Sequence, residues 1–188
     1  MLHHIEREGC VLVLVDYQQR LMPTIHGAQR VLDEALFIAE AARLLGVRTL
    51  GTEQNPGGLG PNVAQVRDSC ERTIAKMHFD ACRDGLLAAL DEGGARRVVI
   101  AGCEAHVCLC QTSLGLLRHG LEVAVVAQAC GSRRAEDHAL AMQRLAQAGA
   151  AIVGSEMVVF EWLGSCEHPA FREALKLLKR RAAGASAH

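Results

Sequence analysis

Short apolar segments alternate along this chain with longer segments of helical periodicity, and this alternation constrains the fold more than any other feature. Residues 10–15 are apolar at every position, which is typical of a strand buried on both faces of a parallel sheet. Residues 27–45 carry apolar side chains at helical spacing and are followed by Gly46, as at the end of an amphipathic helix.

The same two patterns recur to the end of the chain. We expect strands at residues 10–15, 47–52, 73–75, 97–101, 122–127 and 150–153. We expect helices at residues 27–45, 86–90, 135–148, 156–163 and 169–181, and one that begins near Cys108 and ends at Gly120. The glycines and prolines of residues 53–62 predict an irregular loop. This order predicts an α/β fold, a three-layer α/β/α sandwich with a mainly parallel six-stranded sheet.

Length and composition indicate one domain with an aliphatic core. The chain has 188 residues, of which 50% are hydrophobic and only 3% aromatic, enough to bury a sizeable core. We expect residues 1–181 to form a single domain. Residues 182–188 are small and have little to bury, so we expect a disordered tail there.

Charge and cysteine usage argue against several kinds of partner. The formal net charge is −1, without the basic stripe and aromatic surface that bind nucleic acids. The apolar run at 10–15 is too short for a signal peptide or a membrane span. The eight cysteines are scattered through expected strands and helices, which favours reduced thiols. We therefore expect a soluble cytoplasmic protein with no nucleic-acid or membrane partner.

Three reactive side chains stand at or just past the ends of expected strands. They are Asp16, Lys76 and Cys108. Ligands of a parallel sheet bind beyond the carboxyl ends of its strands, so we expect these side chains to share one edge. Each residue alone has an ordinary structural explanation, as a turn former, a solvated lysine or a small buried cysteine, and the prediction depends on their joint placement.

The position of Cys108 near a helix N-terminus favours a nucleophile. The partial positive charge and free N–H groups of a helix N-terminus stabilise a thiolate and can hold an oxyanion. A thiol with a pKa of about 8.5 still needs activation at neutral pH. Asp16 would take its proton and Lys76 would act electrostatically. These residue types indicate acyl transfer through a thioester.

Other chemistries have weaker support in the sequence. A zinc site would use Cys103, His106, Cys108 and Cys110, but these lack paired Cys-x-x-Cys spacing. The glycine-rich stretch 53–62 does not fit a nucleotide-binding pattern. We predict no metal and no cofactor.

A protein of another class remains the alternative to an enzyme. A non-hydrolytic interaction or redox-sensing protein would keep the fold and a reactive thiol, with Cys103 or Cys110 as a resolving thiol. Asp16 and Lys76 favour the hydrolase, because a binding module has no chemical need for them.

Three motifs in order resemble one known superfamily over nearly the whole chain. Residues 12–18 read Leu-Val-Leu-Val-Asp-Tyr-Gln, residues 76–79 Lys-Met-His-Phe, and residues 102–108 Gly-Cys-Glu-Ala-His-Val-Cys. They are similar to the first strand, the lysine motif and the nucleophile motif of the isochorismatase-like cysteine hydrolases. Residues 52–61, 102–105, 137–149 and 155–156 are similar to the isochorismatase-domain-containing subgroup.

The resemblance implies roles for individual residues. Cys108 would be the nucleophile, Asp16 the general base and Lys76 the electrostatic partner. A cis peptide bond between Cys103 and Glu104 would let the N–H groups of Glu104 and Cys108 form an oxyanion hole.

The resemblance also implies a substrate pocket and an assembly. Gln18 would be a polar contact of the substrate and Phe79 a pocket wall. Members are commonly homo-oligomers, so we expect a homo-oligomer that acts on a small molecule with an amide or related C–N bond.

Departures from the superfamily pattern narrow the reaction. Nicotinamidases carry Asp-x-His after the second strand as metal ligands, but residues 53–55 are Glu-Gln-Asn, which implies no metal and a substrate other than nicotinamide. True isochorismatases act without a cysteine nucleophile, so Cys108 implies a different reaction. Ala105 stands where many members have threonine.

Overall fold

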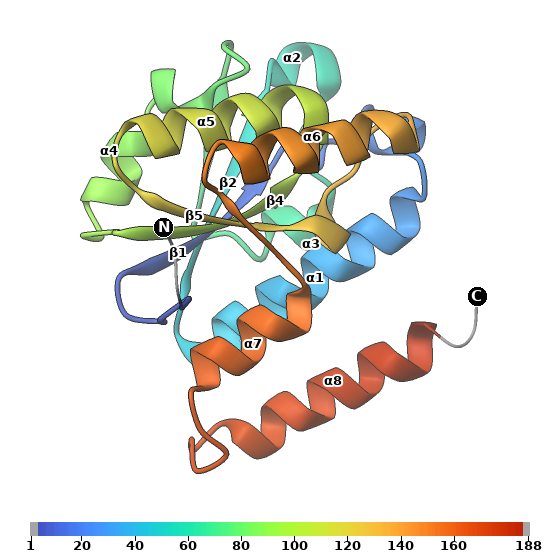
Figure 1. The fold of residues 1–188 in the computed structure, drawn as a ribbon. Helices are drawn as coiled ribbons and strands as arrows, with labels where there is room; N and C mark the ends of the chain where they lie inside the picture. The colour runs from blue at the N-terminus through green and yellow to red at the C-terminus, as the bar shows by residue number, and fades with distance from the viewer. Residues whose placement is uncertain (1–3, 186–188) are drawn as a thin grey trace.

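A computed structural model describes residues 4–185, with side chains for residues 4–182. Six strands form one sheet in the order β3-β2-β1-β4-β5-β6, and all neighbouring pairs are parallel. The strands are β1 (Cys10–Val15), β2 (Arg48–Gln54), β3 (Arg72–Lys76), β4 (Arg97–Gly102), β5 (Glu122–Val126) and β6 (Ala151–Val153). The predicted α/β/α sandwich is confirmed (Figure 1).

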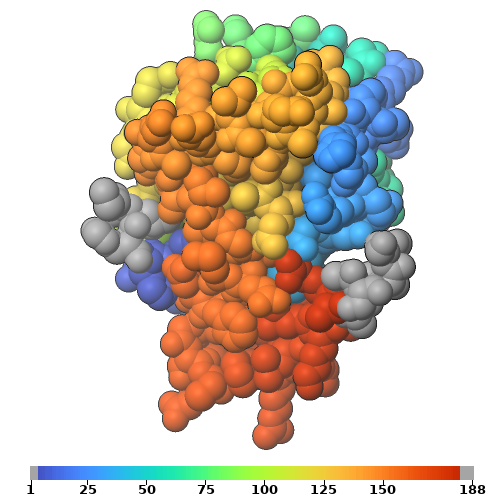
Figure 2. Space-filling model, turned by 45° about the vertical axis from the view of Figure 1, so that its right-hand side comes forward, coloured from blue at the N-terminus to red at the C-terminus, as the bar shows by residue number. Residues whose placement is uncertain are grey.

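Helices cover both faces of the sheet (Figure 1). One face carries α1 (Ala28–Leu45) and α7 (Ser155–Leu163), and the other carries α4 (Leu86–Asp91), α5 (Cys110–Arg118) and α6 (Ala135–Gln147). The last helix, α8 (Phe171–Ala185), packs on α1 and α7. Figure 2 shows it, in red, at the lower end of the molecule. None of the described helices is long and apolar enough to cross a membrane.

Strand β1 is the centre of the core, as its continuous apolar sequence predicts. It pairs with β2 on one side and β4 on the other, and each of its side chains is at most 6% exposed. The strand order reverses at β1 and β4, which is where parallel sheets of this type open a crevice for ligands. The chain segments that follow β1 and β4 therefore form the natural place for a site.

Several boundaries differ from the sequence expectation. Strand β2 continues two residues beyond Thr52 to Gln54, because its last residues pair with β3. The expected loop 53–62 contains the short helix α2 (Pro56–Leu59), which starts with a proline, a residue suited to the first helical position. A second short helix, α3 (Ala64–Arg67), follows.

The expected disordered tail 182–188 differs in part from the structure. Helix α8 runs to Ala185, beyond the expected end at Arg181, since the alanines of this stretch are strong helix formers. Residues 186–188 lie outside the described residues.

We predict that truncation of a β1 side chain destabilises the protein strongly. Leu12 is 0% exposed between the two helical layers, so Leu12→Ala should lower the free energy of unfolding by about 2–5 kcal/mol. The matched control is Leu140→Ala on α6, where the side chain is 63% exposed and the expected change is within about 0.5 kcal/mol. Equilibrium urea denaturation measures both, and equal losses would contradict the central position of β1.

Candidate active site

The three reactive side chains expected at one edge of the sheet are brought together there. Asp16 directly follows β1, Lys76 ends β3, and Cys108 lies in a π-helical turn (Ala105–Leu109) that leads into α5. The Lys76 Nζ atom is 2.8 Å from Asp16 Oδ2, and both side chains are 0% exposed. Cys108 is buried beside them, 6% exposed, and the charges of Asp16 and Lys76 both act on its thiol.

The backbone at Asp16 aims its carboxylate at this cluster. Val15 lies opposite Thr52 in the β1–β2 register, so regular alternation would turn Asp16 to the other face of the sheet. A left-handed φ of 55° ends the alternation. Thr52 Oγ1 then donates a 2.6 Å hydrogen bond to Asp16 Oδ1. The strained backbone at Asp16 therefore directs its carboxylate toward the cluster.

Lys76 is held by three oxygen atoms. Its Nζ donates to Gln54 Oε1 at 2.7 Å and to the carbonyl of His78 at 3.5 Å, in addition to the ion pair with Asp16. A buried ammonium group needs such partners, because its desolvation is costly. Gln54 was missed by the sequence analysis, which ended the second strand at Thr52. Only the pairing of Gln54 with Lys76 across the β2–β3 ladder identifies it.

The segment from Gly102 to Cys108 has an unusual backbone. A Cβ atom at Gly102 would overlap the backbone oxygen of Val15, and φ is +154° there, so only glycine fits. The next peptide bond but one, Cys103–Glu104, is cis, as the family resemblance implies. Leu109 N–H bonds back to the carbonyl of Glu104 at 3.2 Å. Cys108 lies in the first turn, where N–H groups lack partners within the helix.

The thiol of Cys108 rests in its neutral form at neutral pH. Burial and the nearby Asp16 carboxylate raise the pKa of Cys108 to about 12, and the opposing effect of Lys76 is smaller. The stabilisation of a thiolate expected from the helix N-terminus is therefore opposed by burial and by Asp16. A thiol in this state can act as a nucleophile only after a base removes its proton.

The structure places Gln18 differently from the expected substrate contact. Gln18 is 0% exposed. Its Nε2 donates to the carbonyls of Gln54 and Gly60 at 3.0 and 2.6 Å, and its Oε1 accepts from Gln54 N at 2.9 Å. The whole amide therefore ties β2 to the following loop. The expected pocket wall, Phe79, is 50% exposed on the segment after Lys76.

A second polar cluster borders the cysteine segment. Glu104 Oε2 accepts from Arg133 Nε at 2.9 Å and lies 3.8 Å from His106 Nε2. His106 Nδ1 is 3.0 Å from Ser132 Oγ. Within residues 4–185, no group of three or more His, Cys, Asp or Glu side chains is arranged to hold a metal ion.

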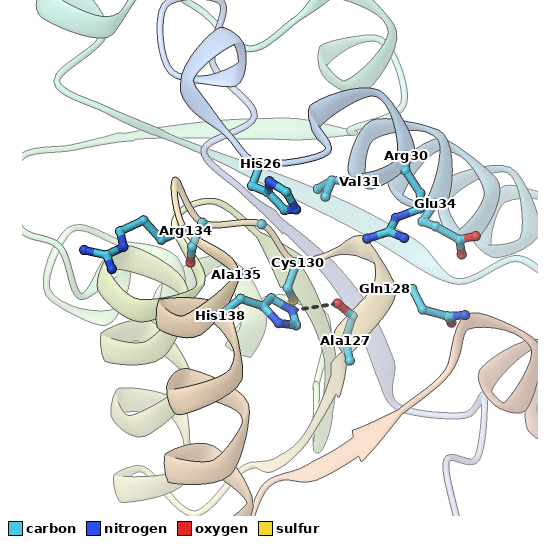
Figure 3. Close-up of a pocket in the computed structure, with 12 residues that line it drawn as sticks. His26, Arg30, Val31, Glu34, Ala127, Gln128, Cys130, Arg134, Ala135 and His138 are labelled. Atoms are coloured by element: carbon cyan, nitrogen blue, oxygen red, sulfur yellow. Dashed lines mark hydrogen bonds between the residues drawn. The ribbon is translucent and has the colours of Figure 1, made fainter. Parts of the chain in front are cut away.

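A well-defined cavity lies away from the cysteine. It has a volume of about 390 Å³ and lies between the N-terminal ends of α1 and α6 (Figure 3). His138, one of its walls, has Nε2 3.1 Å from the carbonyl of Ala127. Its lining includes Ser132 but none of Asp16, Lys76 and Cys108. The chemistry of the buried cluster, rather than cavity size, therefore identifies the candidate site.

Comparison with known proteins gives the family. Residues 10–157 match the model of the isochorismatase domain. Isochorismatase domain-containing protein 2 of Homo sapiens is 37% identical over 92% of this chain and 84% of its own length. The MAR1 ribonuclease structure of Caenorhabditis elegans is 32% identical, with a TM-score of 0.87, over 93% of this chain and 91% of that chain.

A more distant solved structure supports the same fold. The YcaC gene product of Escherichia coli, described as an octameric hydrolase of unknown specificity, is 21% identical, with a TM-score of 0.86, over 96% of this chain and 90% of that chain. The model of the isochorismatase domain matches most of the chain, and the matched residues include Asp16, Lys76 and Cys108 at one edge of the sheet. This chain therefore belongs to the isochorismatase domain family, whose fold supports a hydrolase role.

Proposed function

We propose that the protein is a cysteine-dependent hydrolase of a small amide or a related C–N bond. The observation that carries the proposal is the state of Asp16 Oδ2. This oxygen is paired with Lys76 Nζ at 2.8 Å, yet no described group donates a well-aligned hydrogen bond to it. It is the acceptor available for the proton of Cys108.

The first half of the reaction forms a thioester. Cys108 Sγ attacks the substrate carbonyl carbon while its proton passes to Asp16, and the electron pair of the C=O bond moves to oxygen. When the C=O bond re-forms, the C–N bond breaks and Asp16 returns the proton to the leaving nitrogen. Lys76 holds the carboxylate in position throughout.

The second half releases the acid and restores the thiol. Asp16 takes a proton from water, whose oxygen attacks the thioester carbon. The C–S bond then breaks and the proton goes to sulfur. The cycle consumes one water molecule and needs no cofactor. The N–H groups of Glu104 and Cys108, at the start of the π-helical turn, form the oxyanion hole.

The redox-sensing alternative has less support. A sensor thiol needs a low pKa and access to oxidant, whereas the pKa of Cys108 is raised to about 12. Burial also raises the pKa of both candidate resolving thiols, that of Cys103 well above its usual value and that of Cys110 less strongly.

We predict that Cys108→Ala abolishes hydrolysis without loss of the fold. Turnover in a screen of small amides should fall by at least about 10³-fold, because the nucleophile is removed. Cys110→Ala is the matched control, since Cys110 is also buried and lies two residues further along the same segment. The screen also includes single-stranded RNA, since one similar structure is described as a ribonuclease. Normal turnover by Cys108→Ala would refute the mechanism.

We predict that Asp16→Asn separates thiolate formation from catalysis. The Asp16 charge raises the pKa of Cys108, and Lys76 lowers it. Without that charge the buried ammonium favours the thiolate, so the pKa falls and iodoacetamide should alkylate Cys108 faster at pH 8. In the unchanged protein, the alkylation rate should rise about tenfold per pH unit from pH 7 to 10.

Hydrolysis by Asp16→Asn should nevertheless fall by about 10²–10⁴-fold, because the general base is lost. Asp33→Asn on the exposed face of α1 is the control and should change neither rate. Alkylation rates come from mass spectrometry, and slower alkylation of Asp16→Asn would contradict this account of the charges.

We also propose assembly into a homo-oligomer. The similar Escherichia coli structure is described as octameric, and three exposed apolar side chains, Leu140, Met157 and Phe160, lie on α6 and α7. Figure 2 shows these helices in yellow-orange and orange on one face of the molecule. Light scattering coupled to gel filtration should give a multiple of the 20.2 kDa chain mass. A mass of one chain at micromolar concentration would exclude a stable oligomer.

A further inference from the structure

Gln54 stands at the end of β2 between the ion pair and the nucleophile. It pairs with Lys76 in the β2–β3 ladder and is 9% exposed. Its Oε1 is 2.7 Å from Lys76 Nζ and 3.8 Å from Cys108 Sγ. One amide oxygen therefore contacts both the cation and the thiol.

The orientation of the Gln54 amide is fixed by its other partners. Its Nε2 donates to the carbonyl of Met77 at 2.8 Å. A reversed amide would place its NH₂ group against the Lys76 ammonium group, which can only donate. The side-chain amide of Gln18 bonds both the carbonyl group and the N–H group of Gln54. The oxygen is therefore constrained to face the reactive groups.

The donors and acceptors around Gln54 Oε1 indicate the role of this oxygen. The Lys76 ammonium group donates to two acceptors, Gln54 Oε1 and the His78 carbonyl, and is paired with Asp16 Oδ2 at 2.8 Å. The Cys108 thiol has one proton, whose acceptor is Gln54 Oε1, and the charge of the Asp16 carboxylate acts on the same thiol. An amide oxygen accepts a hydrogen bond but does not remove the proton, so only Asp16 acts as a base.

The charged groups near the thiol are few. Asp16 from the end of β1 and Lys76 from β3 act on Cys108. On its own segment, Glu104 is engaged by Arg133, and His106 contacts Ser132. Gln54, which is uncharged, therefore lies where it can change how strongly Asp16 and Lys76 act on the Cys108 thiol.

We propose that Gln54 is a positioning residue of the nucleophile: its side-chain oxygen fixes the ammonium group of Lys76 against Asp16 and holds the Cys108 thiol in its neutral form between turnovers. Removal of the oxygen leaves one N–H bond of Lys76 free to turn to sulfur and stabilise a thiolate. A carboxylate in its place adds a negative charge beside sulfur and opposes the thiolate. This role rests on the proposed function of Cys108.

Two variants of similar side-chain length test the proposal with opposite expected signs. Gln54→Met removes the acceptor, so Cys108 should be alkylated by iodoacetamide about three- to tenfold faster at pH 8 than in the unchanged protein. Gln54→Glu adds charge, so alkylation should be about three- to tenfold slower. A change only in the access of iodoacetamide to Cys108 would not change the alkylation rate in opposite directions in the two variants. Gln143→Met on the exposed face of α6 is the control and should leave the rate unchanged.

Turnover of an amide found in the screen gives the second measurement. Both Gln54 variants should lower kcat by about tenfold or more, because Lys76 is no longer fixed against Asp16. If the unchanged protein turns over no amide, the proposed function fails, but the alkylation rates still test Gln54. If it does turn over an amide and both variants alkylate like it, the Gln54 inference alone fails. Loss of cooperative unfolding in both variants would assign Gln54 a purely structural role and would also overturn the inference.

Discussion

The buried ion pair between Asp16 and Lys76 is the interaction on which the candidate site depends. Two charges that are fully removed from water cost several kcal/mol each in desolvation. A separation of 2.8 Å and the hydrogen bonds from Thr52 and to Gln54 offset that cost. The charges come from β1 and β3, which do not pair, and β2 between them supplies both hydrogen-bonding side chains. The site therefore requires that β2 lie between β1 and β3.

The same ion pair explains why the nucleophile rests as a thiol. A lysine alone beside a cysteine would favour the thiolate. Here Asp16 already neutralises the Lys76 charge, and burial penalises a further anion, so the pKa of Cys108 is raised to about 12. One carboxylate thus balances the cation, and in the proposed mechanism it also acts as the base. In that mechanism the thiol loses its proton when a carbonyl group arrives, and no reactive thiolate is stored beforehand.

The sequence predicted the parts of the fold that depend on local pattern. The bounds of β1 agree at both ends, because an apolar run closed by Asp16 has only one interpretation in a parallel sheet. The shared edge of Asp16, Lys76 and Cys108 follows from the same rule. Gln54 could not be found in this way, since its position depends on the register of β2 against β3. The substrate contact expected for Gln18 stays a prediction, and sequence could not show that its amide bonds the backbone of Gln54 and Gly60.

The register of β2 against β3 also determines where the reactive side chains lie. A slip of one residue between β2 and β3 would turn Lys76 to the opposite face of the sheet and separate it from Gln54. Residues 55–71, which join these strands, are bonded to the same framework, for example through Asn55 N–H to the Lys76 carbonyl and Val63 N–H to the Tyr17 carbonyl. The loop is tied back at Gly60, whose carbonyl accepts from Gln18, and at Asn62, whose Nδ2 donates to the carbonyl of Thr52. Gln18 also bonds the backbone of Gln54, and Thr52 also bonds Asp16, so the loop is anchored to the same residues that position the reactive groups.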